Sequence, residues 1–274
     1  MNQPLVSVIV PTKNSSQFLE ECLLSIKNQT YQNIELVVVD NFSSDTTQDI
    51  ASRYTNKFFK IGPERSAQRN HGSAQAMGTY VVFIDSDMKL SKNVINSCVT
   101  KMHEGSYKGI IIPEESFGDG FWAQCKKLER SFYVGVDAIE AARFFNKEDF
   151  DSVKGYNKAL VSGEDWDLSD RIEMKGQLAR INDYIFHNEG KISLLQTLKK
   201  KYYYAQKAAT YLTETKTIPT AKKRKQGVLG RYVLYFKKPS KLFRNPLIGL
   251  GMLFIKTCEF GAGGFGLINK KFIK

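Results

Sequence analysis

Two carboxylates stand one residue apart at the end of an apolar run. The run Val81–Ile84 is followed by Asp85 and Asp87, and four consecutive apolar residues are typical of a buried strand. Carboxylates near a core are costly unless they are paired, hydrogen-bonded or bound to a metal. Two oxygen donors at a strand end suit Mg²⁺ or Mn²⁺, which accept one or two carboxylates and leave positions for substrate phosphates. The alternative is a turn in which both aspartates cap the next helix, and this is the commoner reading of an isolated D-x-D.

Glu164 and Asp165 form a second acidic pair, in the stretch S-G-E-D-W-D-L that starts at Ser162. A helix that begins at Ser162 or Gly163 would place both carboxylates in its first turn, where the helix dipole favours negative charge. Dipole matching alone could therefore explain the pair. The functional interpretation is that one of the two carboxylates acts as a general base on an acceptor hydroxyl.

One histidine and two arginines are further candidates. His187 ends an apolar run and is one of only three histidines. A strand-end imidazole could complete a carboxylate-held metal site, although a lone histidine is more often structural. Arg65 and Arg69 stand four residues apart and so share a helical face. They could meet a phosphate or a nucleotide, or they could pair with nearby acidic side chains.

Strands and helices are predicted to alternate through the first 112 residues. Short apolar runs predict strands, and apolar residues three or four apart predict helices. Their spacing fits βαβ units, so we expect an α/β fold with an open, mostly parallel sheet flanked by helices. The predicted strands are 6–10, 34–39, 58–61, 80–84 and 109–112, and the predicted helices are 17–28, 45–54, 66–76 and 92–102.

Polar residues follow three of these strands. Thr12 and Asn14 come after the first strand, Asp40 after the second, and Asp85 with Asp87 after a later one. Ligands of such sheets bind beyond the carboxyl ends of the strands, so this placement favours a site over a simple turn at the D-x-D. The sequence has no G-x-G-x-x-G after the first strand and no G-x-x-x-x-G-K-[ST]. An ordinary dinucleotide site or P-loop is therefore not expected.

The composition is that of a packed globular protein. The 274 residues are 42% hydrophobic and 12% aromatic, which argues against a disordered chain. The four cysteines include no C-x-x-C pair, which is typical of reduced thiols in a cytosolic compartment rather than of disulfides or a zinc site. The apolar run at 5–10 is too short for a signal peptide and has no basic flank. These features predict a cytoplasmic protein.

The charge is divided unevenly along the chain. Residues 1–198 carry a net charge of −4, whereas residues 199–274 hold 18 Lys and Arg and two acidic residues, for a net charge of +16. We predict a domain of residues 1–198 and a basic, aromatic-rich, helical region of residues 199–274. Such asymmetry points to an anionic partner surface, either a membrane or a nucleic acid.

The segment 247–268 is largely apolar but contains Lys256 and Glu259. It is long enough to span a bilayer, yet the two charges would cost several kcal/mol there. We therefore favour a segment in the membrane interface, with basic residues on anionic headgroups and aromatic residues at the boundary. Packing on the domain of residues 1–198 or an oligomer contact is the second alternative, and nucleic-acid binding is the least favoured.

Four motifs in this order resemble family-2 glycosyltransferases with the GT-A fold. They are V-S-V-I-V-P-T-K-N, V-V-V-D-N-F-S-S-D, R-N-x-G-x-x-x-A-x-G-x-Y-x-x-F-I-D-S-D and G-E-D-W-D-L. Each motif alone is moderately specific, but four in sequence at these spacings are highly specific. The resemblance runs through residues 4–190 and implies a nucleotide-sugar-binding catalytic domain in residues 1–198.

The resemblance implies a nucleotide-binding set. Asp40 would hydrogen-bond the base, Arg69 would lie beside the nucleotide, and Asp85 would approach the ribose or the metal. The complete set is Pro11, Thr12, Asn14, Asp40, Arg69 and Asp85.

The resemblance also implies the metal ligands and the catalytic residues. Asp87 would bind Mn²⁺ or Mg²⁺ directly, and His187 matches a position that is a third metal ligand in several family members. Asp165 matches the usual position of the base, with Glu164 in support.

The implied reaction moves a sugar from a nucleoside-diphosphate donor, with a UDP-sugar expected, to a hydroxyl acceptor with inversion. From the basic region 199–274 alone, rather than from the resemblance, we expect the acceptor to be a polyprenyl-linked glycan or a growing surface glycan, in cell-surface polysaccharide or glycoprotein-glycan assembly. The enzyme would then be peripheral on the cytosolic face of the membrane. A nucleotidyltransferase, which would release pyrophosphate instead, is one alternative, and a non-catalytic membrane- or partner-binding module with a degenerate site is the other. A homo-oligomer is also compatible with the sequence.

Overall fold

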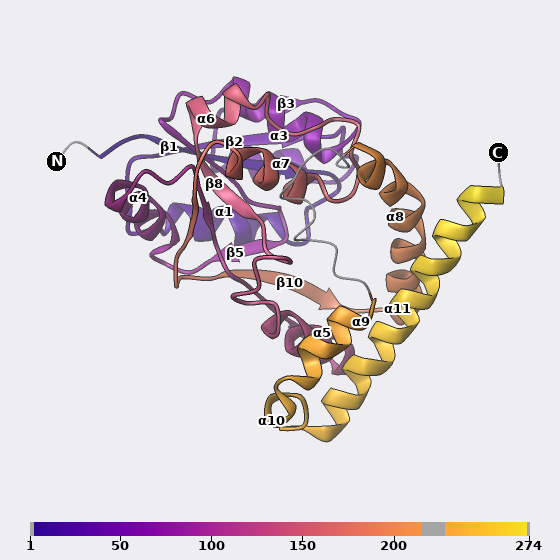
Figure 1. Cartoon of the computed structure of the whole chain (residues 1–274). Helices are drawn as coiled ribbons and strands as arrows, with labels where there is room; N and C mark the ends of the chain where they lie inside the picture. Colours follow the sequence, from indigo (N-terminus) through magenta and orange to yellow (C-terminus); the bar gives the residue numbers. More distant parts are fainter. Residues whose placement is uncertain (1–2, 215–227, 273–274) are drawn as a thin grey trace. The chain divides into compact units, whose positions relative to one another are not determined.

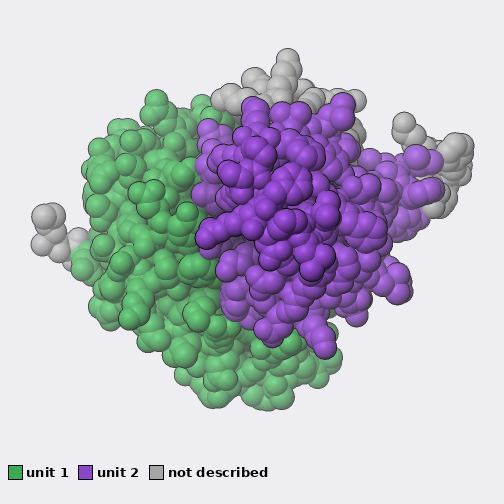
Figure 2. All heavy atoms as spheres, turned by 90° about the horizontal axis from the view of Figure 1, so that it is seen from below, with its two compact units in different colours: residues 1–113, 141–159, 164–187 green, residues 114–140, 160–163, 188–274 purple. Residues whose placement is uncertain are grey.

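The computed structural model describes residues 3–214 and 228–272, and the side chains of 3–207 and 228–268. The chain forms two compact units, which Figure 2 colours separately. Unit 1 comprises residues 1–113, 141–159 and 164–187, and unit 2 comprises residues 114–140, 160–163 and 188–274. Each unit is made of several segments of the sequence, so this division does not test a single boundary after residue 198. That boundary stays a prediction. Residues 215–227 of the predicted basic region lie outside the described part of the chain.

Unit 1 is built on a seven-stranded sheet. Its strand order is β3-β2-β1-β4-β8-β6-β9, and only β8 runs antiparallel to its neighbours. The mostly parallel sheet expected from the sequence is therefore present. The strands are β1 (Val6–Thr12), β2 (Ile34–Asp40), β3 (Phe58–Lys60), β4 (Tyr80–Phe83), β6 (Gly109–Ile111), β8 (Ala142–Asn146) and β9 (Leu178–Arg180).

A second, shorter sheet includes β5 (Met88–Leu90) and β10 (Ile185–Lys191). The two strands pair antiparallel, and His187 lies opposite Met88. Met88 follows Asp87 directly, so this pairing brings the histidine beside the second aspartate of the D-x-D.

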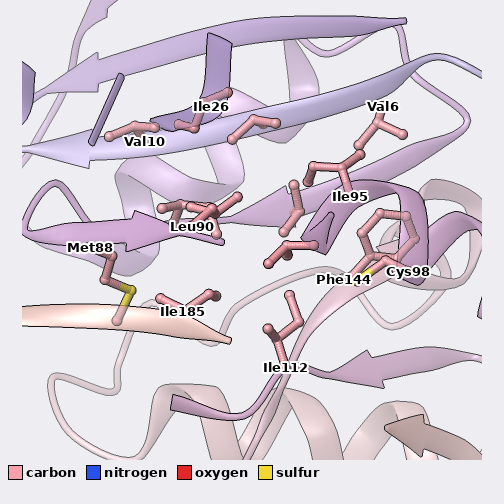
Figure 3. Packing of buried hydrophobic residues seen from close by; sticks show 14 of the residues in the cluster. Val6, Val10, Ile26, Met88, Leu90, Ile95, Cys98, Ile112, Phe144 and Ile185 are labelled. Atoms are coloured by element: carbon pink, nitrogen blue, oxygen red, sulfur yellow. The ribbon is translucent and has the colours of Figure 1, made fainter. Parts of the chain in front are cut away.

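Helices cover both faces of the large sheet (Figure 1). Successive strand residues point to opposite faces, and the strands of unit 1 are apolar on both, as expected for a sheet covered on both sides. One face packs on α1 (Leu19–Lys27), α2 (Thr47–Ser52) and α4 (Val94–Glu104). Figure 3 shows part of this core, in which Ile26 and Ile95 from the helices meet strand side chains.

The opposite face packs on α3 (Arg65–Ala74), α6 (Lys147–Ser152) and α7 (Glu164–Glu173). Gly72 allows α3 to approach β1 closely, since a Cβ there would lie 2.5 Å from Cγ2 of Ile9. This close contact fixes the helix that carries Arg69, one turn before Gly72.

Unit 2 contains β7 (Glu114–Asp119) and five helices among its described residues. Its own core gathers Cys125, Phe132, Tyr235, Leu242, Met252 and Ile255. The helices are α5 (Phe121–Ser131), α8 (Leu194–Glu214), α9 (Val228–Phe236), α10 (Pro239–Leu242) and α11 (Pro246–Phe272). The prediction of a helical C-terminal region agrees with these elements. Within unit 2, α8 and α11 run side by side (Figure 1).

Candidate active site

The ends of β1 and β2 lie side by side, with Thr12 opposite Asp40. The buried Asp40 carboxylate accepts hydrogen bonds from the hydroxyls of Thr12 (2.8 Å) and Ser43 (2.5 Å) and from the backbone N–H of Ser43 (2.7 Å). Three donors thus satisfy the oxygens of this buried carboxylate. Asp40 thus shapes the turn after β2, and its role in binding a base stays a prediction.

The loop after β1 bends at Asn14, which has a φ of 47°. This left-handed conformation is more accessible to Asn than to most residues. The Asn14 side-chain oxygen accepts a hydrogen bond from the backbone N–H of Ser44 (2.9 Å), and the backbone N–H of Asn14 donates to Ser43 Oγ (2.7 Å). Pro11 and Thr12 are buried within β1. The predicted nucleotide-pocket residues Pro11, Thr12 and Asn14 therefore lie with Asp40 at one edge of the sheet.

Gln68 joins these strand ends to α3. Its buried side-chain amide donates to the carbonyl of Thr12 (2.8 Å) and to that of Val39 (2.6 Å). The Thr12 carbonyl also accepts a hydrogen bond from the backbone N–H of Asn41 (2.9 Å), so Gln68 adds a second donor there. By bonding to both carbonyls, Gln68 holds β1, β2 and α3 together at this edge.

Arg69 connects the two acidic clusters found in the sequence. Its side chain is fully buried, and Nη2 lies 2.6 Å from Asp85 Oδ1 while Nη1 lies 3.0 Å from Asp165 Oδ1. Glu164 Oε1 is 3.6 Å from Nη1. A buried guanidinium requires such anionic partners, and its planar fork can serve several carboxylates at once. The guanidinium of Arg69 thereby joins the D-x-D to the Glu164–Asp165 pair.

Asp85 is held in its ionised form. Burial alone would raise its pKa, but the positive charges of Arg69, Arg143 and Arg65 outweigh burial and hold the pKa well below its usual range. Arg143 lies on β8 with Nη1 3.6 Å from Asp85 Oδ2. The arginines thus contact both oxygens of Asp85. The predicted approach of Asp85 to the ribose or the metal stays a prediction.

Glu164 and Asp165 differ sharply in their surroundings. Glu164 is 4% exposed at its side chain and is paired with Arg65 at 3.0 Å, whereas the Asp165 side chain is 26% exposed. Burial, reinforced by the negative charge of Asp165, raises the pKa of Glu164 despite Arg65 and Arg69. Asp165 is the more accessible carboxylate and is the better placed of the two to reach an acceptor hydroxyl.

Tyr156 contacts both Asp165 and Arg69. Its hydroxyl donates to Asp165 Oδ1 at 3.2 Å, and the guanidinium carbon of Arg69 lies 5.0 Å from its ring centroid. The ring also packs edge-on against Phe83 of β4. Tyr156 and Arg69 both contact Asp165 Oδ1 and so orient this carboxylate.

Asp87 and His187 face each other across the β5–β10 pair. His187 Nε2 lies 3.4 Å from Asp87 Oδ2, and their side chains are 21% and 35% exposed. The serine between the two aspartates is also tied in place, since Ser86 Oγ donates to Ser15 Oγ at 2.9 Å. The loop after β1 and the D-x-D turn are thereby connected.

The Asp87–His187 pair fits a divalent cation of the predicted kind. Ligand atoms lie about 2.0–2.2 Å from such an ion, so two ligands at roughly a right angle are about 3 Å apart, close to the observed distance. Among the residues that the structure describes, no group of three or more His, Cys, Asp or Glu side chains is arranged to hold a metal. Two protein ligands are sufficient for Mg²⁺ or Mn²⁺ when substrate phosphates and water supply the rest.

The structure brings most of the predicted site residues into two contact groups in unit 1. One contains Arg69, Asp85, Glu164 and Asp165, and the other contains Asp87 and His187. Sequence reasoning missed Gln68, Arg143 and Tyr156. Arg143 alone carried a signal, because a charged residue inside the apolar stretch A-R-F-F needs a buried partner.

Comparison with a family model gives a match over residues 7–152, described as glycosyl transferase family 2. A *Campylobacter jejuni* protein named GalNAc(5)-diNAcBac-PP-undecaprenol beta-1,3-glucosyltransferase is 27% identical over 215 residues, which cover 75% of this chain and 63% of that protein. Glycosyltransferase GlyA of *Streptococcus pneumoniae* is 27% identical over 77% of this chain and 30% of its own length. The chain thus spans less than two thirds of the length of these relatives.

Solved structures share the fold at low sequence identity. Mannosyltransferase PcManGT of *Pyrobaculum calidifontis*, in complex with GDP-Man and Mn²⁺, superposes with a TM-score of 0.63 at 17% identity, covering 97% of this chain and 88% of that one. *Staphylococcus aureus* TarS 1–349 in complex with UDP-GlcNAc gives a TM-score of 0.53 at 17% identity, covering 98% and 92%. These likenesses confirm the predicted fold. The family match covers more than half of the sequence, so the chain belongs to glycosyl transferase family 2.

Proposed function

We propose that this protein transfers a sugar from a nucleoside-diphosphate donor to a hydroxyl acceptor with inversion at the anomeric carbon. The observation that carries the proposal is the contact of one buried arginine, Arg69, with both Asp85 and Asp165. This contact ties the carboxylate expected to deprotonate the acceptor to the strand end where the donor is expected.

Asp165 is proposed as the general base. In a single displacement the acceptor hydroxyl attacks from the side opposite the leaving group, so one carboxylate suffices to remove its proton. Arg69 and Tyr156 hold Asp165 Oδ1 in place.

Asp87 and His187 are proposed to hold Mn²⁺ or Mg²⁺ together with the donor diphosphate. A divalent cation there would neutralise the charge that develops on the leaving diphosphate. Support comes from the 3.4 Å separation of the two side chains and from the Mn²⁺ bound with GDP-Man in the PcManGT structure.

The donor is proposed to be a UDP-sugar and the acceptor a lipid-linked glycan. The TarS structures contain UDP or UDP-GlcNAc, and the name of the *C. jejuni* relative describes a diphosphate-undecaprenol-linked acceptor. Such an acceptor would place this protein at the cytosolic face of a membrane, and the net charge of +16 in residues 199–274 suits an anionic surface there.

The test uses the full chain with a panel of UDP- and GDP-sugars. Thermal unfolding with and without Mn²⁺ selects the donor, and turnover is then measured with polyprenyl-diphosphate-linked glycans. We expect a nucleoside diphosphate as the product and an inverted linkage by NMR. Release of pyrophosphate would instead indicate nucleotidyl transfer, and a retained linkage would contradict the single displacement.

A further inference from the structure

The two charged residues within the apolar segment 247–268 point inward in unit 2. Lys256 Nζ lies 2.5 Å from Glu129 of α5 and 2.9 Å from Glu259, whose other carboxylate oxygen is 2.8 Å from Lys126 of α5. The Lys256 and Glu259 side chains are 9% and 2% exposed. The charges that would oppose contact with lipid are therefore neutralised inside the protein.

Glycines on the inner side of α11 allow close packing on α5 and α8. A Cβ at Gly251 would lie 2.4 Å from the Phe121 ring, and a Cβ at Gly266 would lie 2.6 Å from the carbonyl oxygen of Tyr202. Contacts with these two helices run along most of α11 (Figure 1). The inner side of α11 is thus covered by unit 2 itself.

The outer side of α11 is an uninterrupted uncharged stripe. Its large side chains are exposed, with values between 53% for Ile268 and 68% for Phe265. Successive members of this set are three or four residues apart, except for the eleven-residue step from Phe254 to Phe265, in which Thr257 and Gly261 are also exposed. This spacing places them all on one helical face. We call this face the α11 stripe, and it consists of Leu247, Leu250, Phe254, Thr257, Gly261, Phe265 and Ile268.

The one hydroxyl in the α11 stripe is already hydrogen-bonded. Thr257 Oγ1 donates to the carbonyl of Leu253 (2.8 Å) and lies 2.6 Å from the Tyr232 hydroxyl of α9. Its transfer from water therefore costs less than that of an unbonded hydroxyl. The contact also places α9 beside the stripe, and α9 exposes Leu229, Val233 and Phe236 in a helical spacing of its own.

Basic residues accompany these apolar faces. Lys237, Lys238 and Arg244 are exposed between α9 and α11. The sequence has no Asp or Glu from residue 215 to residue 258, and Glu259 is buried. An apolar face flanked by cations is complementary to an anionic lipid surface, whereas a second copy of the same basic face would be repelled by it.

We propose that the α11 stripe and the exposed apolar face of α9 insert into the interface of an anionic bilayer, with α11 lying along the membrane. Among the described residues, Pro246–Ile268 is a helix long and apolar enough to cross a membrane by length and composition. However, α5 and α8 cover one side of α11, and Lys256 and Glu259 form buried ion pairs on that side. Both features favour an α11 that lies in the membrane interface over one that crosses the bilayer. The inference rests on the membrane location in the proposed function but not on the transfer reaction.

The test is flotation of the full chain with phosphatidylcholine vesicles, with and without phosphatidylglycerol. The double variant L250E/F254E should lower the partition into anionic vesicles at least tenfold. A matched control is M77E/M174E in unit 1, where both methionines are exposed by 60% or more, and it should float like the wild type. Circular dichroism is the check that both variants are folded. Equal flotation of L250E/F254E and the wild type would overturn the proposal.

Trp122 gives a second readout that requires no change to the stripe. Its ring stacks on Phe254 at a centroid distance of 6.1 Å, so brominated lipids should quench its fluorescence when the stripe inserts. The W122F variant should lose this quenching while still floating. Absence of quenching in the wild type would overturn the proposal. It would also be overturned if the wild type bound no vesicles and instead formed a soluble dimer that L250E/F254E does not form, because the stripe would then contact a second copy of the chain. No donor or acceptor is present in these assays, so a failure here would leave the transfer reaction untouched.

Discussion

Arg69 Nη1 lies 3.0 Å from Asp165 Oδ1, although 96 residues separate the two in the sequence. The arginine is completely buried and the aspartate is partly exposed. The guanidinium can therefore orient the carboxylate from the protein side while the other side of the carboxylate stays accessible to an acceptor. This geometry assigns Arg69 a positioning role toward the proposed base, in addition to its pairing with Asp85.

Replacing Arg69 by Lys tests that role. Lysine keeps the charge but cannot contact Asp85 and Asp165 with two separate nitrogens. We expect kcat to fall about 100-fold, in the range of a misplaced general base, with a smaller change in KM for the donor. Steady-state kinetics measure the changes in kcat and in KM for the donor separately. R65K is the matched control, because Arg65 is partly exposed and contacts Glu164 instead, and it should lower kcat less than tenfold.

Replacing Asp165 by Asn removes the proposed base with little change in shape. Loss of general-base catalysis typically costs about 10²–10⁴-fold in rate, so transfer should fall by that factor while donor affinity is kept. Turnover and donor titration by calorimetry measure the two quantities. Y156F, which removes only the hydroxyl 3.2 Å from Asp165, should have a smaller effect. Normal turnover by D165N would remove Asp165 as the base.

The ion pairs of Asp85 predict a pH dependence of stability. The pKa of Asp85 is lower in the folded protein than its ordinary value of 3.8, so the unfolded chain binds a proton first as the pH falls. Its stabilising contribution is complete above about pH 5 and is lost as the pH drops below 3.8 toward the folded pKa. Urea unfolding of the wild type and D85N should differ by about 2 kcal/mol at pH 7. That difference should shrink at pH 3, and a constant difference would contradict the assignment.

Gly72 links the packing of α3 to the site. A valine there would place its side chain against Ile9 and Val39, where even a Cβ lies within 2.5 Å and 3.1 Å of side-chain atoms. Overpacking of this kind costs about 1–3 kcal/mol and should also displace Arg69. We expect a lower midpoint of thermal unfolding and reduced turnover for G72V. The control A74V, at an exposed position on the same helix, should change neither.

Much of the sheet could be predicted from the sequence, because its parallel strands are short apolar runs. The predicted strand 34–39 is observed as Ile34–Asp40, and the predicted strand 80–84 as Tyr80–Phe83. The position of β8 between β4 and β6 could not be predicted. It pairs with residues more than 30 positions away, and periodicity reports only local structure.

The partners of the buried charged residues could not be predicted from the sequence either. Lys256 and Glu259 were expected to be costly in an apolar segment, but α5 supplies Glu129 and Lys126 as partners. Likewise, the sequence predicts Asp85 at the ribose or the metal, which stays a prediction, but it does not reveal the pairing of Asp85 with Arg69 and Arg143. In each case the partner comes from a distant part of the chain, and only the tertiary structure brings the charges together.

The measurement that bears most directly on the proposed function is calorimetric binding of UDP and GDP with and without Mn²⁺. Asp87 and His187 should make binding of the selected nucleotide at least tenfold tighter with Mn²⁺ in the wild type. In D87N and H187A that gain should disappear, while the weaker metal-independent affinity stays unchanged. An unaltered Mn²⁺-dependent gain in both variants would contradict the proposed metal site.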